Sequence, residues 1–280
     1  MLGTRIITAV ILLIVLLAVL TAGGSLGWNI FVLVFLVGAF WEWAKLGRLG
    51  AVQSITFAAC GGAACASMAW LLDLQVHAYP VLALSCVFWV AFAPWCLRKV
   101  SLGVFSKSLP FLAVGFVLIS AAGLALILAK SNGVVFLLST VAICFAADIF
   151  AYVFGKTLGK RKLAPSISPG KSWEGAIGGA LSVLALSWLV VFMANDFPLL
   201  QSSWQVVALE RWHPVIFSIW LLILSAYSVV GDLFESMLKR HAGVKDSSQL
   251  LPGHGGILDR IDAQLPVLPL AMLLVSAVAS

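Results

Sequence analysis

The sequence predicts an all-α integral membrane protein with about nine transmembrane helices. Of its 280 residues, 62% are hydrophobic and only 10% are charged, and the mean hydropathy is +1.10. A water-soluble domain of this length would need far more polar surface. Apolar runs long enough to cross about 30 Å of hydrocarbon as a helix recur along the chain. They cover residues 6–22, 28–43, 51–72, 80–97, 109–129, 133–154, 176–194, 214–231 and 263–279.

The second and third runs carry the weakest helix signals, and the first has a second interpretation. The run at 6–22 follows Arg5 and precedes small residues, so it also resembles a cleavable signal peptide. We expect it to be retained, because an odd number of crossings fits the charge distribution. The run at 28–43 is short, and the run at 51–72 is diluted by Gln53, Ser54 and two glycines.

The basic residues indicate the orientation in the membrane. With the N-terminus in the cytoplasm and nine crossings, 15 of the 17 Lys and Arg residues lie on the cytoplasmic side. Only Lys130 and Arg211 lie outside. This bias predicts a cytoplasmic N-terminus and an external C-terminus. It also explains the net charge of +6 without a nucleic-acid partner, and it favours contact with anionic membrane lipid.

The acidic residues divide the chain into two parts. The first 130 residues hold only Glu42 and Asp73, and we expect 1–130 to form scaffold helices. We expect residues 131–280 to form the catalytic region, with two long cytoplasmic connections. Seven of the eleven acidic residues lie in or beside these connections: Asp148, Glu174, Asp232, Glu235, Asp246, Asp259 and Asp262. The five cysteines lie in or beside apolar runs without metal-ligand spacing, which indicates ordinary packing.

The first polar block runs from Asp148 to Gly175. Asp148 and Tyr152 are four residues apart near the cytoplasmic end of a predicted helix, so they share one face. An ionisable group at that depth costs free energy unless it faces protein, water or a ligand. The lysines and arginine that follow, from Lys156 to Lys162, also fit an ordinary basic segment next to the membrane.

The stretch SPGKSWEG within this block resembles a nucleotide-binding P-loop only in part. That pattern needs a glycine five residues before Gly170, where Pro165 stands, and no buried strand precedes it. Ser172 is predicted to cap a helix whose first turn contains Glu174, which would leave N–H groups and Lys171 facing the cytoplasm. The segment is therefore either an anion site or a capped helix with a surface lysine.

The second polar block runs from Gly231 to Asp262. Asp232, Glu235, Ser236 and Lys239 have the spacing of one helix face. We expect Gly243 to end this helix and the glycines at 253, 255 and 256 to allow positive φ and close approach to a ligand. Asp259 and Asp262 are three residues apart, and we expect them on one face at the start of the last helix.

These charges have two interpretations. They either neutralise one another as salt bridges, or they bind a magnesium–triphosphate complex, with carboxylates on the cation and basic side chains on the phosphates. Mg²⁺ needs only one or two carboxylates when water and phosphate complete its shell. His254 stands alone among glycines, so we expect a hydrogen bond there and no metal ligation.

The two blocks together resemble the phosphatidate cytidylyltransferase family, also called CDP-diacylglycerol synthases. The resemblance is specific from about residue 145 to 265. In the second block it rests on Ser236, Lys239, Arg240, Lys245, Asp246, Ser248, Pro252, His254, Gly255, Gly256, Asp259, Arg260 and Asp262. In the first block it rests on Asp148, Ala151, Tyr152, Gly155, Lys156, Gly159, Ser168, Pro169, Lys171, Ser172, Glu174 and Gly175.

The resemblance implies a nucleotidyltransferase of the bacterial cytoplasmic (inner) membrane whose active site faces the cytoplasm. Its substrates would be CTP and phosphatidic acid, and its products CDP-diacylglycerol and pyrophosphate. Its cofactor would be Mg²⁺, with room for a second cation such as a monovalent ion. Asp232, Asp259 and Asp262 would be metal ligands and, with Lys239, catalytic. The residues expected to bind substrate are Asp148, Tyr152, Lys156, Ser168, Lys171, Ser172, Glu174, Ser236, Arg240, Lys245, His254, Gly255, Gly256 and Arg260.

Two other functions fit parts of the same pattern. A CTP-dependent lipid kinase would use similar residues but would release CDP in place of pyrophosphate. An ion-coupled transporter would use Asp148, Asp232 and Asp259 as intramembrane acids, although the sequence shows no repeated halves. Gly175, Gly178 and Gly179 predict close packing of their helix, either within the chain or in a homodimer.

Overall fold

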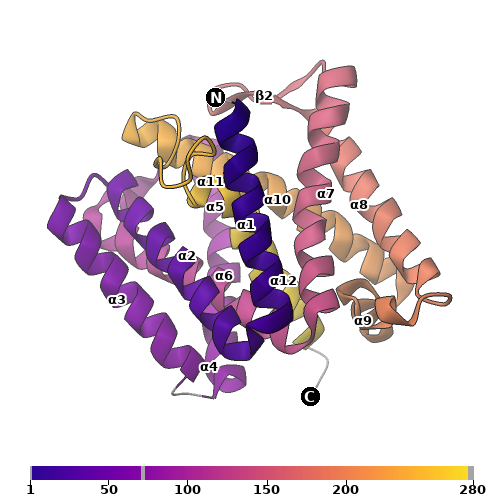
Figure 1. Cartoon of the computed structure of the whole chain (residues 1–280). Coiled ribbons are helices and arrows are strands. Elements are labelled where there is room, and N and C mark those ends of the chain that lie inside the picture. The colour runs from indigo at the N-terminus through magenta and orange to yellow at the C-terminus, as the bar shows by residue number, and fades with distance from the viewer. Residues whose placement is uncertain (1, 71–72, 277–280) are drawn as a thin grey trace.

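The computed structural model describes residues 2–70 and 73–276, and nearly all of them are helical (Figure 1). Within these ranges, eight helical segments are long and apolar enough to cross a membrane. They are α1 (Leu2–Ala22), α2 (Gly24–Leu46), α3 (Ala51–Trp70), α4 (Leu74–Val87) continued by η1 (Phe88–Phe92) and α5 (Ala93–Lys99), α6 (Ser108–Ser131), α7 (Val134–Leu158), α8 (Trp173–Met193) and α10 (Pro214–Ala242). The helices predicted from the first eight apolar runs are therefore confirmed, except that residues 71 and 72 of the third lie outside the described residues.

Several shorter elements connect or follow these segments. They are the short helices η2 (Gly103–Ser106), η3 (Pro198–Ser202), α9 (Trp204–Arg211) and α11 (Leu258–Ile261), and the apolar helix α12 (Gln264–Ser276). The π-helical turn η1 lies just before Pro94. Because proline has no N–H, the regular helical bond at that position is missing, and a wider turn relieves the mismatch.

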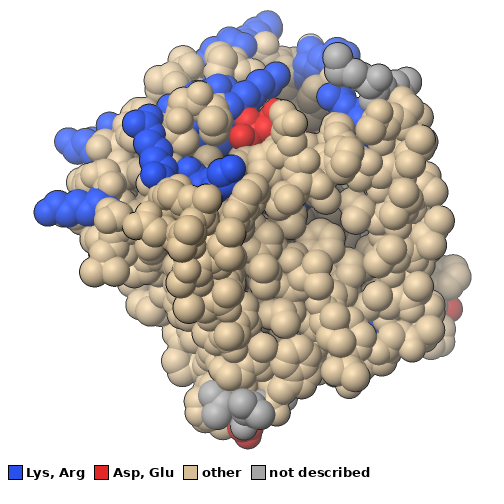
Figure 2. Space-filling model, turned by 60° about the vertical axis from the view of Figure 1, so that its left-hand side comes forward, with Lys and Arg blue, Asp and Glu red and all other residues tan. Residues whose placement is uncertain are grey.

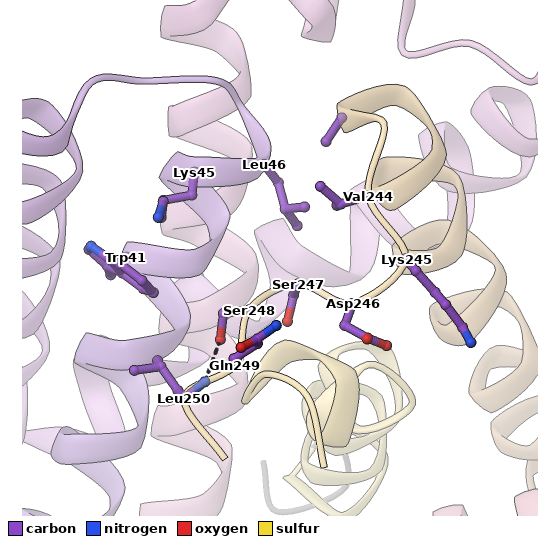
Figure 3. Close-up of a pocket in the computed structure, with 11 residues that line it drawn as sticks. Trp41, Lys45, Leu46, Val244, Lys245, Asp246, Ser247, Ser248, Gln249 and Leu250 are labelled. Carbon is purple, nitrogen blue, oxygen red and sulfur yellow. Dashed lines mark hydrogen bonds between the residues drawn. The ribbon is translucent and has the colours of Figure 1, made fainter. Parts of the chain in front are cut away.

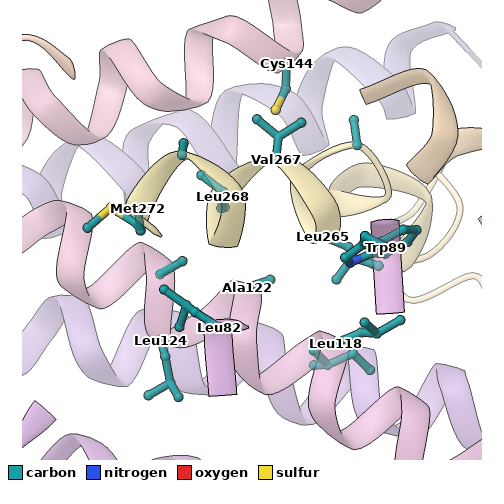
Figure 4. Close-up of a cluster of buried hydrophobic side chains, with 14 of the residues drawn as sticks. Leu82, Trp89, Leu118, Ala122, Leu124, Cys144, Leu265, Val267, Leu268 and Met272 are labelled. Carbon is teal, nitrogen blue, oxygen red and sulfur yellow. The ribbon is translucent and has the colours of Figure 1, made fainter. Parts of the chain in front are cut away.

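Helix α12 corresponds to the ninth predicted run but is shorter than a membrane span. Its 13 residues extend over about 20 Å, and residues 277–279 of the prediction lie outside the described residues. Almost every side chain of α12 is buried against neighbouring helices. Figure 4 shows Leu265, Leu268 and Met272 of α12 facing Leu118 and Leu82 in this core. The helix contacts protein on most sides, so its length need not match the hydrocarbon thickness.

The prediction that Asp259 and Asp262 begin the last helix on one face is wrong. Asp259 lies on the separate one-turn helix α11, Asp262 follows it, and α12 starts only at Gln264. Pro266 provides the physical reason, because it has no N–H to donate to the carbonyl of Asp262 four residues earlier. Gly231 of α10 packs at the same place, where a Cβ atom would stand 2.3 Å from the Asp262 carbonyl oxygen.

Helices α7 and α8 are in close contact through glycines of α8. A Cβ atom at Gly175 would lie 2.6 Å from the carbonyl oxygen of Ala151, and one at Gly179 would lie 2.6 Å from that of Ala147. Gly178 faces the ring of Phe154. Of the two interpretations of these glycines, packing within the chain is therefore the one that the structure shows.

A short β-hairpin connects α7 to α8, and the sequence patterns did not predict it. Strand β1 (Lys162–Ala164) pairs in antiparallel orientation with β2 (Ser168–Ser172), with Lys162 opposite Ser172. The carboxylate of Glu174 accepts hydrogen bonds from the backbone N–H groups of Lys160 and Arg161 at 3.1 Å each. These bonds attach the start of the hairpin to the first turn of α8.

The polar connections gather at one end of the molecule. Figure 1 shows the start of α1, the β-hairpin and the α10–α11 connection at the top, and α9 and the end of α3 below. The Thr8 hydroxyl of α1 donates to the carbonyl of Pro252 at 3.0 Å, which ties the first helix to this end. In Figure 2 blue Lys and Arg atoms cluster at the same end, above a wide uncharged surface. This distribution is typical of a multi-pass membrane protein.

Candidate active site

A cavity of about 570 Å³ lies between α7, α8, α10 and the β-hairpin. Leu163, Val229 and Ala176 give it an apolar portion next to the polar one. Such a mixed lining suits a ligand with a charged head and an apolar body. Seven residues that were predicted to bind substrate or metal line it: Asp148, Tyr152, Lys156, Ser168, Lys171, Ser172 and Asp232.

Helix α7 provides one acidic group of this cavity. Asp148 lies one turn before Tyr152, as expected, and accepts a hydrogen bond from the Ser228 hydroxyl of α10 at 3.2 Å. The Nζ atom of Lys156 lies 5.8 Å from the centre of the Tyr152 ring, one further turn along. A carboxylate, a phenol and an ammonium group therefore follow one another at one-turn intervals along α7.

Strand β2 and helix α10 place opposite charges across the cavity. The Nζ atom of Lys171 lies 2.5 Å from Oδ2 of Asp232, and both side chains remain partly exposed. The Ser236 hydroxyl donates to Oδ1 of Asp232 at 3.3 Å, one turn along α10. Ser172 ends β2 and caps α8 by accepting a hydrogen bond from Gly175 N–H at 3.2 Å, which confirms the predicted cap.

Asp262 does not line this cavity, but it lies close enough to Asp232 for the two carboxyl groups to interact electrostatically. Burial and the nearby negative charge of Asp232 raise its pKa to about 7, with a smaller contribution from Asp148. Lys171 acts in the opposite direction. The carboxyl groups of Asp148, Asp232 and Asp262 thus repel one another, and Lys171 provides the ammonium group that opposes this repulsion at Asp262. A bound cation would relieve the repulsion further.

Asp259 lies in a second cluster, on the α11 side of α10. Its Oδ1 atom accepts a hydrogen bond from Lys239 Nζ at 2.6 Å. Its Oδ2 atom accepts from Gly256 N–H at 2.7 Å and from both the N–H and the hydroxyl of Ser247 at 2.9 Å. Burial would raise the pKa of Asp259, but the bonds from Lys239, Gly256 and Ser247 outweigh it and lower the pKa to about 2. The carboxylate is therefore ionised at neutral pH.

The three predicted metal ligands therefore fall into two groups. Asp232 lines the first cavity and interacts electrostatically with the nearby Asp262, whereas Asp259 faces Lys239, whose Nζ atom also lies 2.5 Å from the buried Glu235. Within the described residues, no group of three or more His, Cys, Asp and Glu side chains is placed to hold a metal ion. The donor set still fits Mg²⁺, which binds hard oxygen atoms and needs only one or two carboxylates beside phosphate and water.

Several other predicted residues of the second block form hydrogen bonds or turns in the loop between α10 and α11. Arg260 donates to the carbonyl of His254 at 2.6 Å and 3.1 Å, and His254 N–H donates to the carbonyl of Leu251 at 2.8 Å. Gly243 ends α10, as predicted, in a left-handed conformation. Of the three glycines expected to allow positive φ, Gly253 (78°) and Gly255 (85°) adopt it and Gly256 does not. Arg240 is exposed near the end of α10.

A second cavity, of about 690 Å³, opens between α2 and this loop (Figure 3). Trp41 and Lys45 line it from α2, and the Lys45 ammonium group stacks on the Trp41 ring at 4.5 Å. Lys245, Asp246 and Ser248 line it from the loop. Residues of the second polar block thus line two cavities.

Comparison with known proteins decides the family. The model of the cytidylyltransferase family matches residues 3–278. The chain belongs to this family. A phosphatidate cytidylyltransferase of Pseudomonas aeruginosa is 38% identical over 279 residues, which cover 96% of this chain and 95% of the relative. One of Staphylococcus aureus (strain COL) is 35% identical over 282 residues, 96% of this chain and 97% of the relative.

A shorter match has higher identity. A phosphatidate cytidylyltransferase of Haemophilus influenzae is 45% identical over 138 residues, 49% of this chain and 44% of the relative. The resemblance and the nucleotidyltransferase class that the sequence predicted are thus confirmed for this cytidylyltransferase.

Sequence reasoning missed one carboxylate of this cytidylyltransferase. Glu42 of α2 is fully buried and hydrogen-bonded to Ser247 in the loop before α11 and to Leu258 at the start of α11, although it lies in the part predicted to be scaffold. The only sequence signal is a single acidic residue near the end of an apolar run. Its partners lie more than 200 residues further along the chain, so no local pattern connects them.

Proposed function

We propose that this chain is a phosphatidate cytidylyltransferase that transfers CMP from CTP to phosphatidic acid in the bacterial cytoplasmic membrane. One observation carries the assignment of the site. A single cavity next to the polar end of the molecule joins an apolar wall to Lys156, Lys171 and the carboxylates of Asp148 and Asp232. A lipid with a phosphate head and a magnesium nucleotide require this combination of surfaces.

The chemistry needs charge screening more than it needs a base. The phosphomonoester of phosphatidic acid is largely dianionic at neutral pH, because its second pKa lies near 6. One of its oxygen atoms forms a bond to the α-phosphorus of CTP. The bond from that phosphorus to the bridging oxygen breaks, and pyrophosphate leaves with the electron pair. The main obstacle is repulsion between the two anionic substrates.

The basic residues of the cavity address this repulsion. Lys171 enters from β2 and Lys156 from the end of α7, so two ammonium groups approach a bound phosphate from different elements. We assign Lys239 and Arg240 of α10 to further phosphate contacts. A ligand phosphate would compete with Asp232 for the Lys171 ammonium group. Binding would therefore replace an internal salt bridge by a contact to the ligand.

The carboxylates would hold the cation. Asp232 offers oxygen atoms in the first cavity with Asp262 nearby, and Asp259 is ionised and points one oxygen toward Lys239 alone. When bound, Mg²⁺ would withdraw negative charge from the triphosphate and from the departing pyrophosphate. The chain's own residues orient the substrates and keep Asp259 ionised.

The proposed orientation places this site at the cytoplasmic surface. With nine crossings, a cytoplasmic N-terminus and an external C-terminus, the β-hairpin and the α10–α11 loop face the cytoplasm. CTP would enter from water, and phosphatidic acid would enter from the inner leaflet past Tyr152, which is largely exposed on α7.

The direct test identifies both products. Purified protein is incubated with CTP labelled at the α-phosphate, phosphatidic acid and Mg²⁺, and the lipid and aqueous products are separated. The proposal expects the label in a lipid of the mass of CDP-diacylglycerol, with one pyrophosphate released per lipid. Release of CDP without labelled lipid would indicate a kinase and contradict the proposal.

A further inference from the structure

We infer that Glu42 is a positioning residue that fixes Asp259 from the other half of the chain. Glu42 lies near the polar end of α2, and its exposed fraction is 0%. Its neighbours in the sequence, Trp41 and Trp43, are large apolar residues. An ionised carboxylate in such surroundings is stable only when hydrogen bonds replace its lost hydration.

Four donors of one loop supply those bonds. The Ser248 hydroxyl and Ile257 N–H donate to Oε1 at 2.5 Å and 2.8 Å. The Ser247 hydroxyl and Leu258 N–H contact Oε2 at 3.0 Å and 2.7 Å. Each oxygen therefore lies within hydrogen-bond distance of one serine hydroxyl and one backbone N–H. The carboxylate holds the two ends of the loop together, since the serines precede its turn and the N–H groups follow it.

Asp259 depends on the same two segments. Its Oδ2 atom accepts hydrogen bonds from Ser247 N–H and Gly256 N–H. The hydroxyl of the same Ser247 contacts Glu42, and Gly256 directly precedes Ile257, whose N–H donates to Glu42. The Ser247 hydroxyl lies 3.0 Å from Glu42 Oε2 and 2.9 Å from Asp259 Oδ2, and its single proton can be donated to only one of them at a time. A shift of the loop away from Glu42 would therefore move the donors that orient Asp259.

Gly256 supports this interpretation independently. A Cβ atom at this position would stand 1.9 Å from Ser247 Oγ and 2.5 Å from Glu42 Oε1. Only glycine lets the backbone come this close to both side chains. The sequence motif His254–Gly255–Gly256 thus serves the contact between Glu42, Ser247 and Asp259.

The inference rests on the proposed role of Asp259 as a metal ligand, and Glu42→Gln tests it. The amide replaces one acceptor oxygen by an NH₂ group that would face a hydroxyl and a backbone N–H. We expect the Mg²⁺ concentration for half-maximal activity to rise at least about tenfold, the effect of losing one hydrogen bond to a charged group. We expect faster hydrogen–deuterium exchange of amides 247–258, measured without Mg²⁺ or substrate. Glu42→Asp, which keeps the charge, should recover part of both changes.

Trp43→Phe is the matched control. Trp43 is the next residue of α2, is equally buried and donates to the carbonyl of Phe111 at 2.9 Å. Its loss should lower the melting temperature but leave the Mg²⁺ requirement and the exchange of the loop unchanged. If Glu42→Gln behaves in the same way, with a Mg²⁺ requirement within twofold of the wild type, the inference is wrong.

Two further variants separate the inference from the proposed function. If Asp259→Asn is inactive while Glu42→Gln matches the wild type, only the inference fails. If Asp259→Asn is fully active, the metal-ligand role of Asp259 fails, and loop exchange in Glu42→Gln still reports whether Glu42 fixes the loop. Should Glu42→Gln not fold, Ser248→Ala removes one donor from the loop side. A smaller change in the same direction would support the inference, and no change would overturn it.

Discussion

At the scale of single residues, the site consists of charges that are paired in the absence of ligand. Lys171 is paired with Asp232, and Lys239 contacts both Glu235 and Asp259. The salt-bridge interpretation of the sequence is thus part of the structure. It does not exclude a substrate site, since a triphosphate and a cation would exchange these internal pairs for ligand contacts at small net electrostatic cost.

Asp259→Asn should abolish CTP turnover while the protein still inserts and folds. The neutral amide loses the charge that three donors and Lys239 stabilise, and we expect activity to fall at least about a hundredfold. Turnover of labelled CTP and the elution profile of the purified protein measure the two properties. Asp196→Asn, at an exposed carboxylate between α8 and α9, is the control and should keep full activity. Activity of Asp259→Asn equal to the control would remove the metal-ligand assignment.

Lys171→Ala should raise the KM for CTP by about tenfold and affect insertion little, because a charged contact to phosphate is lost. Steady-state kinetics with varied CTP provide the measurement. Lys162→Ala changes an exposed lysine on the other strand of the same hairpin and serves as the control. An unchanged KM in Lys171→Ala would leave SPGKS as a helix cap beside a surface lysine.

At the scale of elements, the wall of the first cavity depends on the close approach of α7 and α8. Glycines of α8 face backbone carbonyls of α7, and backbone cannot move aside as the end of a flexible side chain can. The hairpin that carries Lys171 is attached to the same pair of helices through Glu174. Separation of α7 from α8 would therefore disturb both the cavity wall and a phosphate ligand.

Gly179→Ala tests this dependence. The added methyl group would stand 2.6 Å from the Ala147 carbonyl oxygen, and such overpacking costs about 1–3 kcal/mol. We expect a lower melting temperature and reduced activity. Gly27→Ala in α2 adds the same methyl group where no atom lies within 4 Å, so helix propensity should keep or raise the melting temperature. Equal effects of the two variants would show that the α7–α8 contact tolerates separation.

At the scale of the whole molecule, the proposed topology makes a prediction about accessibility. In a variant without its native cysteines, Lys107→Cys before α6 should react with a membrane-impermeant maleimide only after the cells are permeabilised. Asp196→Cys after α8 should react in intact spheroplasts. The positive-inside distribution requires this difference. Labelling with the opposite sidedness would reverse the orientation and place the catalytic cavity outside the cytoplasm.

Local patterns in the sequence were enough to predict the apolar helices and the resemblance to the family. Hydropathy and residue spacing are local properties, so runs of apolar residues predict helices, and the polar stripe of α10 predicts Asp232, Ser236 and Lys239 on one face. The tertiary structure alone decided that Asp259 lies apart from Asp232 and Asp262, that α12 is enclosed, and that Glu42 meets a loop more than 200 residues away. Those contacts depend on how helices pack. When two segments are distant in sequence, their packing leaves no pattern that can be read from either segment alone.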